Sequence, residues 1–218
     1  MNDYALYPAI VPCALTMKPA HVHAEQAGRL MPMERLPFRC LPVVTHPKQG
    51  HPVNELRTAL REAAYIRRTR FTKGDVTIHD FSSRAEDLFM LTSIVPDEAP
   101  EWVHRPFLRW QLADEAIEAS GDLHGVRAWH VCGDLRPGLS RGEWMDQVVD
   151  LVRSVLPAGI VAEIAGHIPR AGRPPHVHIL ISSRYFGRRT YAGVSYPLYR
   201  RLNGCLRQAW VEWACGDA

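Results

Sequence analysis

The chain has 218 residues, 46% of them hydrophobic, and a formal net charge of +3, so it can form one domain with a sizeable core. It has no apolar run near the ~18–20 residues that a membrane helix needs, which excludes a membrane-spanning class and a membrane partner. The N-terminus lacks the basic segment of a signal peptide. Five scattered cysteines without CxxC spacing predict reduced thiols and a cytoplasmic location.

The chain begins with a segment that has no clear pattern. Residues 1–35 contain Pro, Met and His without periodicity and predict a poorly ordered or loosely packed N-terminal arm. A strand is expected at 36–45, a loop at 46–52 and a helix from 54 to about 68. We interpret residues 36–218 as a single domain.

The remaining elements alternate between the two kinds of secondary structure. Strands are expected at 86–95 and 126–135, with a helix at 101–120 between them. Ser140 and Glu143 form a capping-box pattern that opens another helix. Two strands follow at 160–167 and 176–182, and Pro197 begins a last helix. Interspersed helices and strands predict an α+β fold with a central antiparallel β-sheet flanked by helices.

Three histidines surround a Pro/Gly-rich turn late in the chain. His176 and His178 alternate with apolar residues, so they share one face of a strand. The turn between the two strands favours a hairpin, which would bring His167 back beside that pair. Three neutral imidazoles on neighbouring strands make a divalent-metal site with open positions. The alternative is that the His-x-His pair lies on a solvated strand face.

One tyrosine lies on an unusual side of its helix. The apolar side of the helix near residues 54–68 includes Leu60, Ala63 and Ala64, and Tyr65 falls nearly opposite it. A basic run follows directly: Arg67, Arg68, Arg70 and Lys73. A phenol beside cations suits nucleophilic attack on a metal-activated phosphodiester. The alternative is that Tyr65 packs under a loop or is simply exposed.

Four segments occur together in a specific order. They read Ala-Ala-Tyr-Ile-Arg at 63–67, His-Asp-Phe-Ser-Ser-Arg at 79–84, Pro-Asp-Glu-Ala-Pro-Glu-Trp at 96–102 and Pro-Pro-His-Val-His-Ile-Leu-Ile-Ser-Ser-Arg at 174–184. In this order and spacing the chain resembles, over about residues 36–215, the relaxase domain of the MobA/MobL-type plasmid mobilisation proteins. That domain belongs to the HUH endonuclease superfamily.

The resemblance implies a function and a set of roles. The domain would nick and rejoin single-stranded DNA at a plasmid transfer origin through a 5′-phosphotyrosyl intermediate. Tyr65 matches the strand-cleaving tyrosine, and His167, His176 and His178 match the ligands of a divalent cation, which could be Mg, Mn or Zn. Asp80 is a candidate to assist the phenol, with capping or a contact to Arg84 as the alternative. Accessory mobilisation proteins are candidate partners.

Basic residues near these motifs are candidates for DNA binding, because guanidinium groups suit bidentate phosphate contacts. They are Arg67, Arg68, Arg70, Lys73, Arg170, Arg173 and Arg184. A solvated basic face is the alternative.

The chain departs from the family pattern at several points. Family members commonly carry glutamates on the strand where His130 and Cys132 stand here, so a carboxylate role is lost or moved. The loop between His167 and His176 is one residue longer than usual, and Pro174 replaces a common Asn. Residues 1–35 have no recognised counterpart, and the chain stops soon after Trp213, as expected for a relaxase domain alone.

Two alternative functions therefore stay open. The first is a degenerate relaxase-like protein that binds DNA without cleaving it. The second is a metal-dependent phosphodiesterase that uses activated water. A histidine-triad nucleotide hydrolase fits less well, because Leu180 stands where a third alternating histidine is needed.

Overall fold

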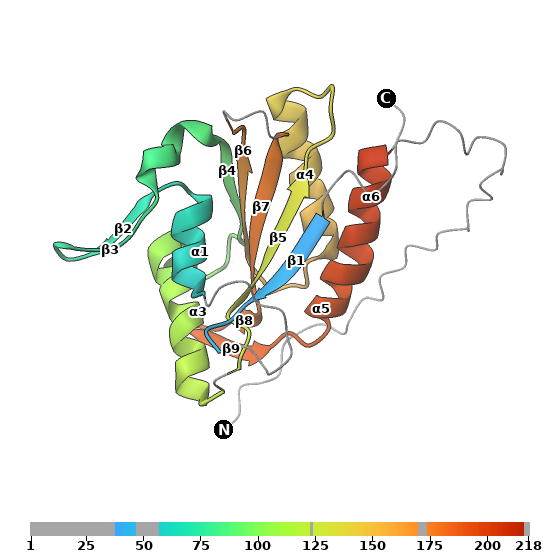
Figure 1. Ribbon diagram of the computed structural model, residues 1–218. Coiled ribbons are helices and arrows are strands. Elements are labelled where there is room, and N and C mark those ends of the chain that lie inside the picture. Colours follow the sequence, from blue (N-terminus) through green and yellow to red (C-terminus); the bar gives the residue numbers. More distant parts are fainter. Residues whose placement is uncertain (1–37, 47–56, 123, 170–173, 216–218) are drawn as a thin grey trace. The chain divides into compact units, whose positions relative to one another are not determined.

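The structure is a computed structural model that describes residues 38–46, 57–122, 124–169 and 174–215. Its centre is a five-stranded sheet in the order β1-β5-β7-β6-β4, with every neighbouring pair antiparallel (Figure 1). The strands are β1 (Phe38–Val43), β4 (Leu88–Ile94), β5 (Ala128–Asp134), β6 (Ala162–His167) and β7 (His176–Ser182). The predicted α+β fold with a central antiparallel sheet is confirmed.

Helices cover both faces of this sheet. One face carries α1 (Ala59–Ile66) and α3 (Pro106–Ser120), and the other carries α4 (Arg141–Val155) and α6 (Arg207–Cys215) (Figure 1). The alternation of β7 explains the two cores: Leu180 packs in the cluster with α1 and α3, whereas Ile179 and Ile181 pack in the cluster with α4 and α6. His176 and His178 therefore lie on the face that α1 covers.

Short elements connect this framework. Two hairpins, β2 (Arg70–Lys73) with β3 (Val76–Asp80) and β8 (Arg184–Phe186) with β9 (Tyr191–Val194), lie outside the main sheet. The others are the 3₁₀ helix η3 (Ser82–Asp87), α2 (Glu101–His104), α5 (Leu198–Arg200) and the π-helix η4 (Arg201–Leu206). Within the described residues, no helix combines the length and apolar character that crossing a bilayer requires.

Several sequence-based expectations need correction. The helix expected at 101–120 is two helices, because Pro106 holds the preceding Arg105 in an extended conformation. The helix expected from 54 begins at Ala59, with Thr58 as its N-cap. Both small hairpins were missed, because their strands are short and largely exposed. The expected arm at 1–35 and most of the loop at 46–52 lie outside the described residues.

Two expectations about local structure are confirmed. The Ser140 hydroxyl accepts a hydrogen bond from the Glu143 backbone N–H, and the Glu143 carboxylate accepts one from the Ser140 backbone N–H. The strands around the histidine turn do form an antiparallel hairpin, in which His167 pairs directly with His176. Local sequence patterns thus define both the start of α4 and the β6–β7 hairpin.

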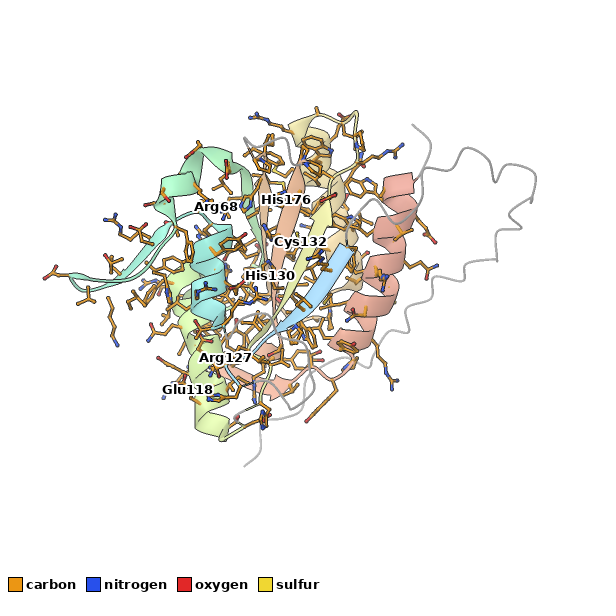
Figure 2. The ribbon with its side chains drawn as sticks, viewed as in Figure 1. Arg68, Glu118, Arg127, His130, Cys132 and His176 are labelled. Atoms are coloured by element: carbon orange, nitrogen blue, oxygen red, sulfur yellow. The ribbon has the colours of Figure 1, made fainter. Side chains whose placement is uncertain are left out.

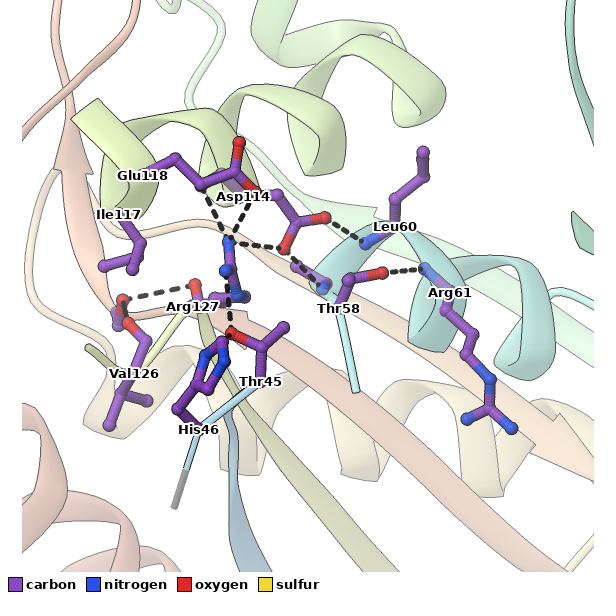
Figure 3. A network of polar contacts seen from close by, with 12 residues as sticks. Thr45, His46, Thr58, Leu60, Arg61, Asp114, Ile117, Glu118, Val126 and Arg127 are labelled. Carbon is purple, nitrogen blue, oxygen red and sulfur yellow. Dashed lines mark hydrogen bonds and ion pairs between the residues drawn. The ribbon is translucent and has the colours of Figure 1, made fainter. Parts of the chain in front are cut away.

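A buried carboxylate fixes the N-terminus of α1. Asp114 of α3 accepts hydrogen bonds from the backbone N–H groups of Ala59 and Leu60 at 2.8 and 3.0 Å (Figure 3). Burial raises the pKa of Asp114 to about 6, although these two bonds and the nearby Arg127 act in the opposite direction. Arg127 also donates to the Asp114 backbone carbonyl and to the Thr45 hydroxyl. These contacts join α1, α3 and the strand ends.

A second buried carboxylate fixes the C-terminal end of α1. Glu163 of β6 is fully buried and accepts hydrogen bonds from Arg67 at 2.9 Å and from the Trp110 indole at 2.9 Å. It also pairs with Arg109, whose side chain is 1% exposed. Arg67 follows the last residue of α1, and the other two partners come from α3. Helix α1 is therefore held to the sheet at both ends.

Candidate metal and nucleophile site

Three histidines converge at one end of the β6–β7 hairpin, under α1. His167 ends β6, and His176 and His178 lie on the neighbouring β7. Figure 2 labels His176 at this end of the sheet. Their ring centroids are 4.9 to 5.6 Å apart, and one nitrogen from each residue lies within 4.8 Å of the others. The structure thus brings together all three metal ligands expected from the sequence.

Backbone carbonyls select the tautomers of two of these histidines. His167 Nε2 lies 2.8 Å from the Ile66 carbonyl oxygen, which can only accept, so this nitrogen carries the hydrogen. Its Nδ1 then has a lone pair, which lies 3.2 Å from an Arg68 nitrogen. Likewise, His176 Nδ1 lies 3.1 Å from the Pro174 carbonyl oxygen, which leaves the lone pair on Nε2. Each ring therefore offers one defined acceptor.

The third histidine has a buried nitrogen without a partner. His178 Nδ1 lies 2.9 Å from His130 Nε2, whereas His178 Nε2 is buried and makes no hydrogen bond within the described residues. An orphaned imidazole nitrogen beside two other imidazoles is the donor set that a divalent transition metal or zinc prefers. The residues therefore fit the divalent cation that the resemblance implies.

The environment keeps two of the ligands neutral, which is the form that binds metals. Burial, and then the charge of Arg68, lowers the pKa of His167 to about 3. Burial, and then the charges of the neighbouring histidines, lowers the pKa of His178 well below its ordinary value. At neutral pH both rings are therefore uncharged.

Tyr65 lies above the histidine cluster and not on an outward face of α1. Its ring is edge-on to His178, with centroids 5.4 Å apart, and it also packs against Phe81 at 5.6 Å. The side chain is half-buried. The helical wheel placed Tyr65 opposite the core residues of α1, but in the structure Tyr65 packs against the same buried cluster and faces the histidines of the sheet.

Arg68 connects the tyrosine to the first histidine. Its guanidinium lies 4.6 Å from the centroid of the Tyr65 ring and donates to the Tyr65 carbonyl and to His167 Nδ1, both at 3.2 Å. The backbone of Arg68 has φ 53°, a left-handed conformation that costs a residue with a side chain roughly 1–2 kcal/mol. Strain of this kind is concentrated at functional positions. Arg68 is also buried, so its charge acts inside the site.

The other basic residues expected to bind DNA are placed differently. Arg67 is engaged with Glu163, and Arg70 pairs with Asp80. Lys73 is exposed on the β2–β3 hairpin. Arg184 follows the opposite end of β7 from His176 and donates to the Ala192 carbonyl. Arg170 and Arg173 lie outside the described residues.

Asp80 has the contacts of a capping residue. Its carboxylate accepts hydrogen bonds from the Ser82 backbone N–H at 3.0 Å and from the Ser82 hydroxyl at 2.6 Å, and it pairs with Arg70. The Ser82 hydrogen bonds, together with Arg70, lower the pKa of Asp80 to about 2. Such a weak base is poorly suited to accept a phenol proton. The capping alternative is favoured, with Ser82 and Arg70 as partners in place of Arg84.

Two residues at the site carry roles that the sequence did not indicate. His130 of β5 was noted only as a departure from the family pattern, and Glu62 of α1 was not singled out. In the structure His130 Nδ1 lies 2.8 Å from a Glu62 oxygen, while its Nε2 faces His178. No local pattern reveals this arrangement, because it depends on the β5–β7 register and on how α1 packs over the sheet.

Comparison with solved structures gives the same fold. A structure described as "Molecular Basis of Vancomycin Resistance Transfer in Staphylococcus aureus" superposes with a TM-score of 0.62 at 13% identity, covering 82% of this chain and 90% of that chain. None of the curated proteins matches the chain in a sequence search. At this level of identity the likeness is one of fold: a five-stranded antiparallel sheet with helices on both faces.

The family assignment rests on the sequence itself. The model of the MobA/MobL family matches residues 57–195, which is more than half of the chain. This span includes Tyr65 and all three histidines. The chain belongs to the MobA/MobL family, the plasmid mobilisation proteins that its motifs resemble.

Proposed function

We propose that the protein is a metal-dependent relaxase that nicks and rejoins single-stranded DNA at a plasmid transfer origin. The observation that carries this proposal is the convergence of His167, His176 and His178, one nitrogen from each within 4.8 Å of the others, with the Tyr65 ring packed on His178. Membership of the MobA/MobL family supports the same function. A cytoplasmic location and accessory mobilisation proteins belong to this proposal.

His167, His176 and His178 would hold one divalent cation, for which their nitrogens favour Mn or Zn over Mg. When bound, the cation polarises the scissile phosphodiester and neutralises the charge that develops on it. The protein would restrict the tautomer of each ring through the nitrogen that does not bind the cation. This nitrogen contacts a backbone carbonyl oxygen in His167 and His176, and the His130 ring in His178. Preorganised ligands of this kind do not have to reorient during the reaction.

Tyr65 would supply the nucleophile. Its phenolic oxygen attacks phosphorus, the bond from phosphorus to the 3′ oxygen breaks, and a 5′-phosphotyrosyl bond forms. The phenol loses its proton to solvent, and the departing 3′ oxygen takes up a proton to become a hydroxyl. Attack by that hydroxyl on the phosphotyrosyl bond reverses the step and rejoins the strand. The adjacent Arg68 charge would attract the scissile phosphate.

DNA binding would use the cations that are not engaged in buried ion pairs. Lys73 is an exposed example on the β2–β3 hairpin, and Arg68 lies beside the nucleophile. Further candidates for phosphate contacts are Arg70, Arg170, Arg173 and Arg184. Arg67 is a weaker candidate, because Glu163 already neutralises it.

The proposal is tested with Tyr65→Phe, which removes one oxygen and little volume. We expect the variant to fold and to bind DNA as the wild type does, while cleavage and the covalent adduct both disappear. The measurement is a denaturing gel of protein incubated with Mn²⁺ and a single-stranded oligonucleotide from the DNA next to its gene. Tyr185→Phe is the matched control, because Tyr185 follows β7 and hydrogen-bonds to Ser195.

The same gel separates the alternatives. An adduct that survives Tyr65→Phe but disappears in Tyr185→Phe would identify Tyr185 as the nucleophile. Cleavage without an adduct in both variants would indicate metal-activated water and a phosphodiesterase. A native gel that shows binding of the oligonucleotide by the wild type, together with a denaturing gel that shows no cleavage, would identify a degenerate, DNA-binding member of the family.

A further inference from the structure

One of the two strand residues that depart from the family pattern, His130, lies in a chain of hydrogen bonds that begins on α1. His130 has Glu62 Oε2 2.8 Å from its Nδ1 and His178 Nδ1 2.9 Å from its Nε2. All three side chains are buried, with exposed fractions of 1% for Glu62, 8% for His130 and 6% for His178. The chain ends at the orphaned His178 Nε2.

The chemistry of the groups fixes the direction of this chain. An ionised carboxylate only accepts hydrogen bonds, so the His130 Nδ1 that faces Glu62 must donate. A His178 ring that binds a cation through Nε2 keeps its hydrogen on Nδ1 and donates it to His130 Nε2. This arrangement needs a His130 whose only ring hydrogen is the one donated to Glu62.

Glu62 is held in its ionised form. Burial acts to raise its pKa, but the hydrogen bond from His130 and the charges of Arg57 and Arg61 lower the pKa below its ordinary value. Arg57 and Arg61 bind its two oxygens at 3.0 and 3.2 Å. Glu62 also lies on the same helix as Tyr65, three residues earlier. One helix thus carries the nucleophile and the start of the hydrogen-bond chain.

We propose that Glu62 is a positioning residue that, through His130, sets the His178 tautomer and so presents Nε2 as a metal ligand. The role rests on the proposed metal site. It also fits the departure at His130: where the resemblance implies a carboxylate on the strand, this chain has an imidazole that connects the site to a carboxylate on α1. Partners that orient ligands typically change metal affinity by about 10–100-fold when they are removed.

The first experiment reads the tautomer directly in the metal-free protein. Nitrogen-15 NMR of the imidazoles at pH 7.5 should show His178 protonated at Nδ1 and unprotonated at Nε2. Glu62→Gln keeps the shape of the side chain but can offer an N–H to His130, so we expect it to shift His178 toward the Nε2-protonated form. A wild-type His178 that is protonated at Nε2 overturns the proposal.

The second experiment measures metal affinity with Co²⁺, whose absorption spectrum reports imidazole ligation. We expect Glu62→Gln to weaken Co²⁺ binding by about 10–100-fold, with circular dichroism confirming that it is folded. Arg61→Gln is the matched control, because it removes an ion pair to the other Glu62 oxygen and leaves the contact to His130. Its affinity should stay within about twofold of wild type.

The outcomes distinguish this proposal from the proposed function. Equal Co²⁺ affinity in the wild type, Glu62→Gln and Arg61→Gln overturns the positioning role and leaves the relaxase function intact. His130→Phe, which removes the acceptor for His178 Nδ1, should weaken Co²⁺ binding in the same way, and a wild-type affinity in this variant also overturns the role. Failure of wild-type protein to bind Co²⁺, Mn²⁺ or Zn²⁺ overturns both the metal site and the positioning role.

Discussion

Two buried glutamates, Glu62 on α1 and Glu163 beneath its C-terminal end, differ in one kind of partner. Glu163 is surrounded by donors that belong to the framework: Arg67, Arg109 and Trp110. Glu62 is also paired with arginines, but one of its oxygens faces His130 and, through it, the histidine cluster. Both carboxylates are at most 1% exposed. The difference lies in what each carboxylate controls.

The comparison separates a carboxylate that stabilises the fold from one that orients the site. Around Glu163 every strong donor is a permanent cation or an indole, so the group joins α1, α3 and β6 as one unit. Around Glu62 the decisive partner is an imidazole, whose two nitrogens exchange roles when a proton moves. Variants at the two positions should therefore affect different measurements.

The largest effect on stability is expected from Glu163→Ala. Removing one partner of a buried ion pair leaves Arg109 uncompensated and typically costs about 3–5 kcal/mol. Urea unfolding of the metal-free protein measures this loss of unfolding free energy. Glu62→Gln is the comparison variant, and we expect it to lose less than half as much, because Arg61 can turn toward solvent. Equal losses of unfolding free energy in the two variants would contradict the distinction between a carboxylate that stabilises the fold and one that orients the site.

An intermediate loss of unfolding free energy is expected when the pH is lowered, because the buried histidines resist protonation. The folded-state pKa of His167 is lowered to about 3 and that of His178 is lowered as well, so the unfolded chain takes up protons first as the pH falls. Stability should be complete above about pH 6.5 and decrease toward pH 3, by up to ~1.4 kcal/mol per pH unit for each histidine. The raised pKa of Asp114 acts in the opposite direction.

This pH dependence is measured by urea unfolding of metal-free protein at pH 7.5 and 5.5. His178→Gln should show a smaller loss between the two values than wild type, because one buried imidazole has been removed. His124→Gln changes an exposed histidine and should leave the loss unchanged. The same pH dependence in all three proteins would show that His178 is not held neutral by the fold.

The smallest effect is expected from Asp114→Asn, which changes a framework carboxylate at the other end of α1. An amide can accept through only one atom, so one of the two α1 N–H groups loses its partner, at a cost of about 1–2 kcal/mol. Glu118→Gln is the control, because Glu118 shares Arg127 but is largely exposed. Thermal unfolding that does not separate these two variants would contradict the capping role.

Much of the site could be predicted because its signals are local. Alternation around the Pro/Gly turn predicted the β6–β7 hairpin and the meeting of three histidines. The capping box at Ser140 is equally local. Each of these features depends on residues a few positions apart, where backbone geometry alone restricts the arrangement.

The remaining features depend on contacts between distant segments. The role of Glu62 needs the packing of α1 over β5, and the neutralisation of Arg67 by Glu163 needs its packing over β6. A basic run in the sequence says nothing about which of its members will be buried against a carboxylate. Likewise, Pro106 marks a boundary that apolar periodicity alone does not show.

The strand order has a consequence for when the site can exist. β7 is the last strand of the main sheet to be synthesised, yet it lies between β5 and β6, which both precede it in the chain. A nascent chain that ends at β6 has two strand pairs with no shared neighbour and lacks two of the three histidines. Domains fold as units, so the cluster forms only once its central strand is inserted. An incomplete chain therefore carries Tyr65 without the complete histidine cluster.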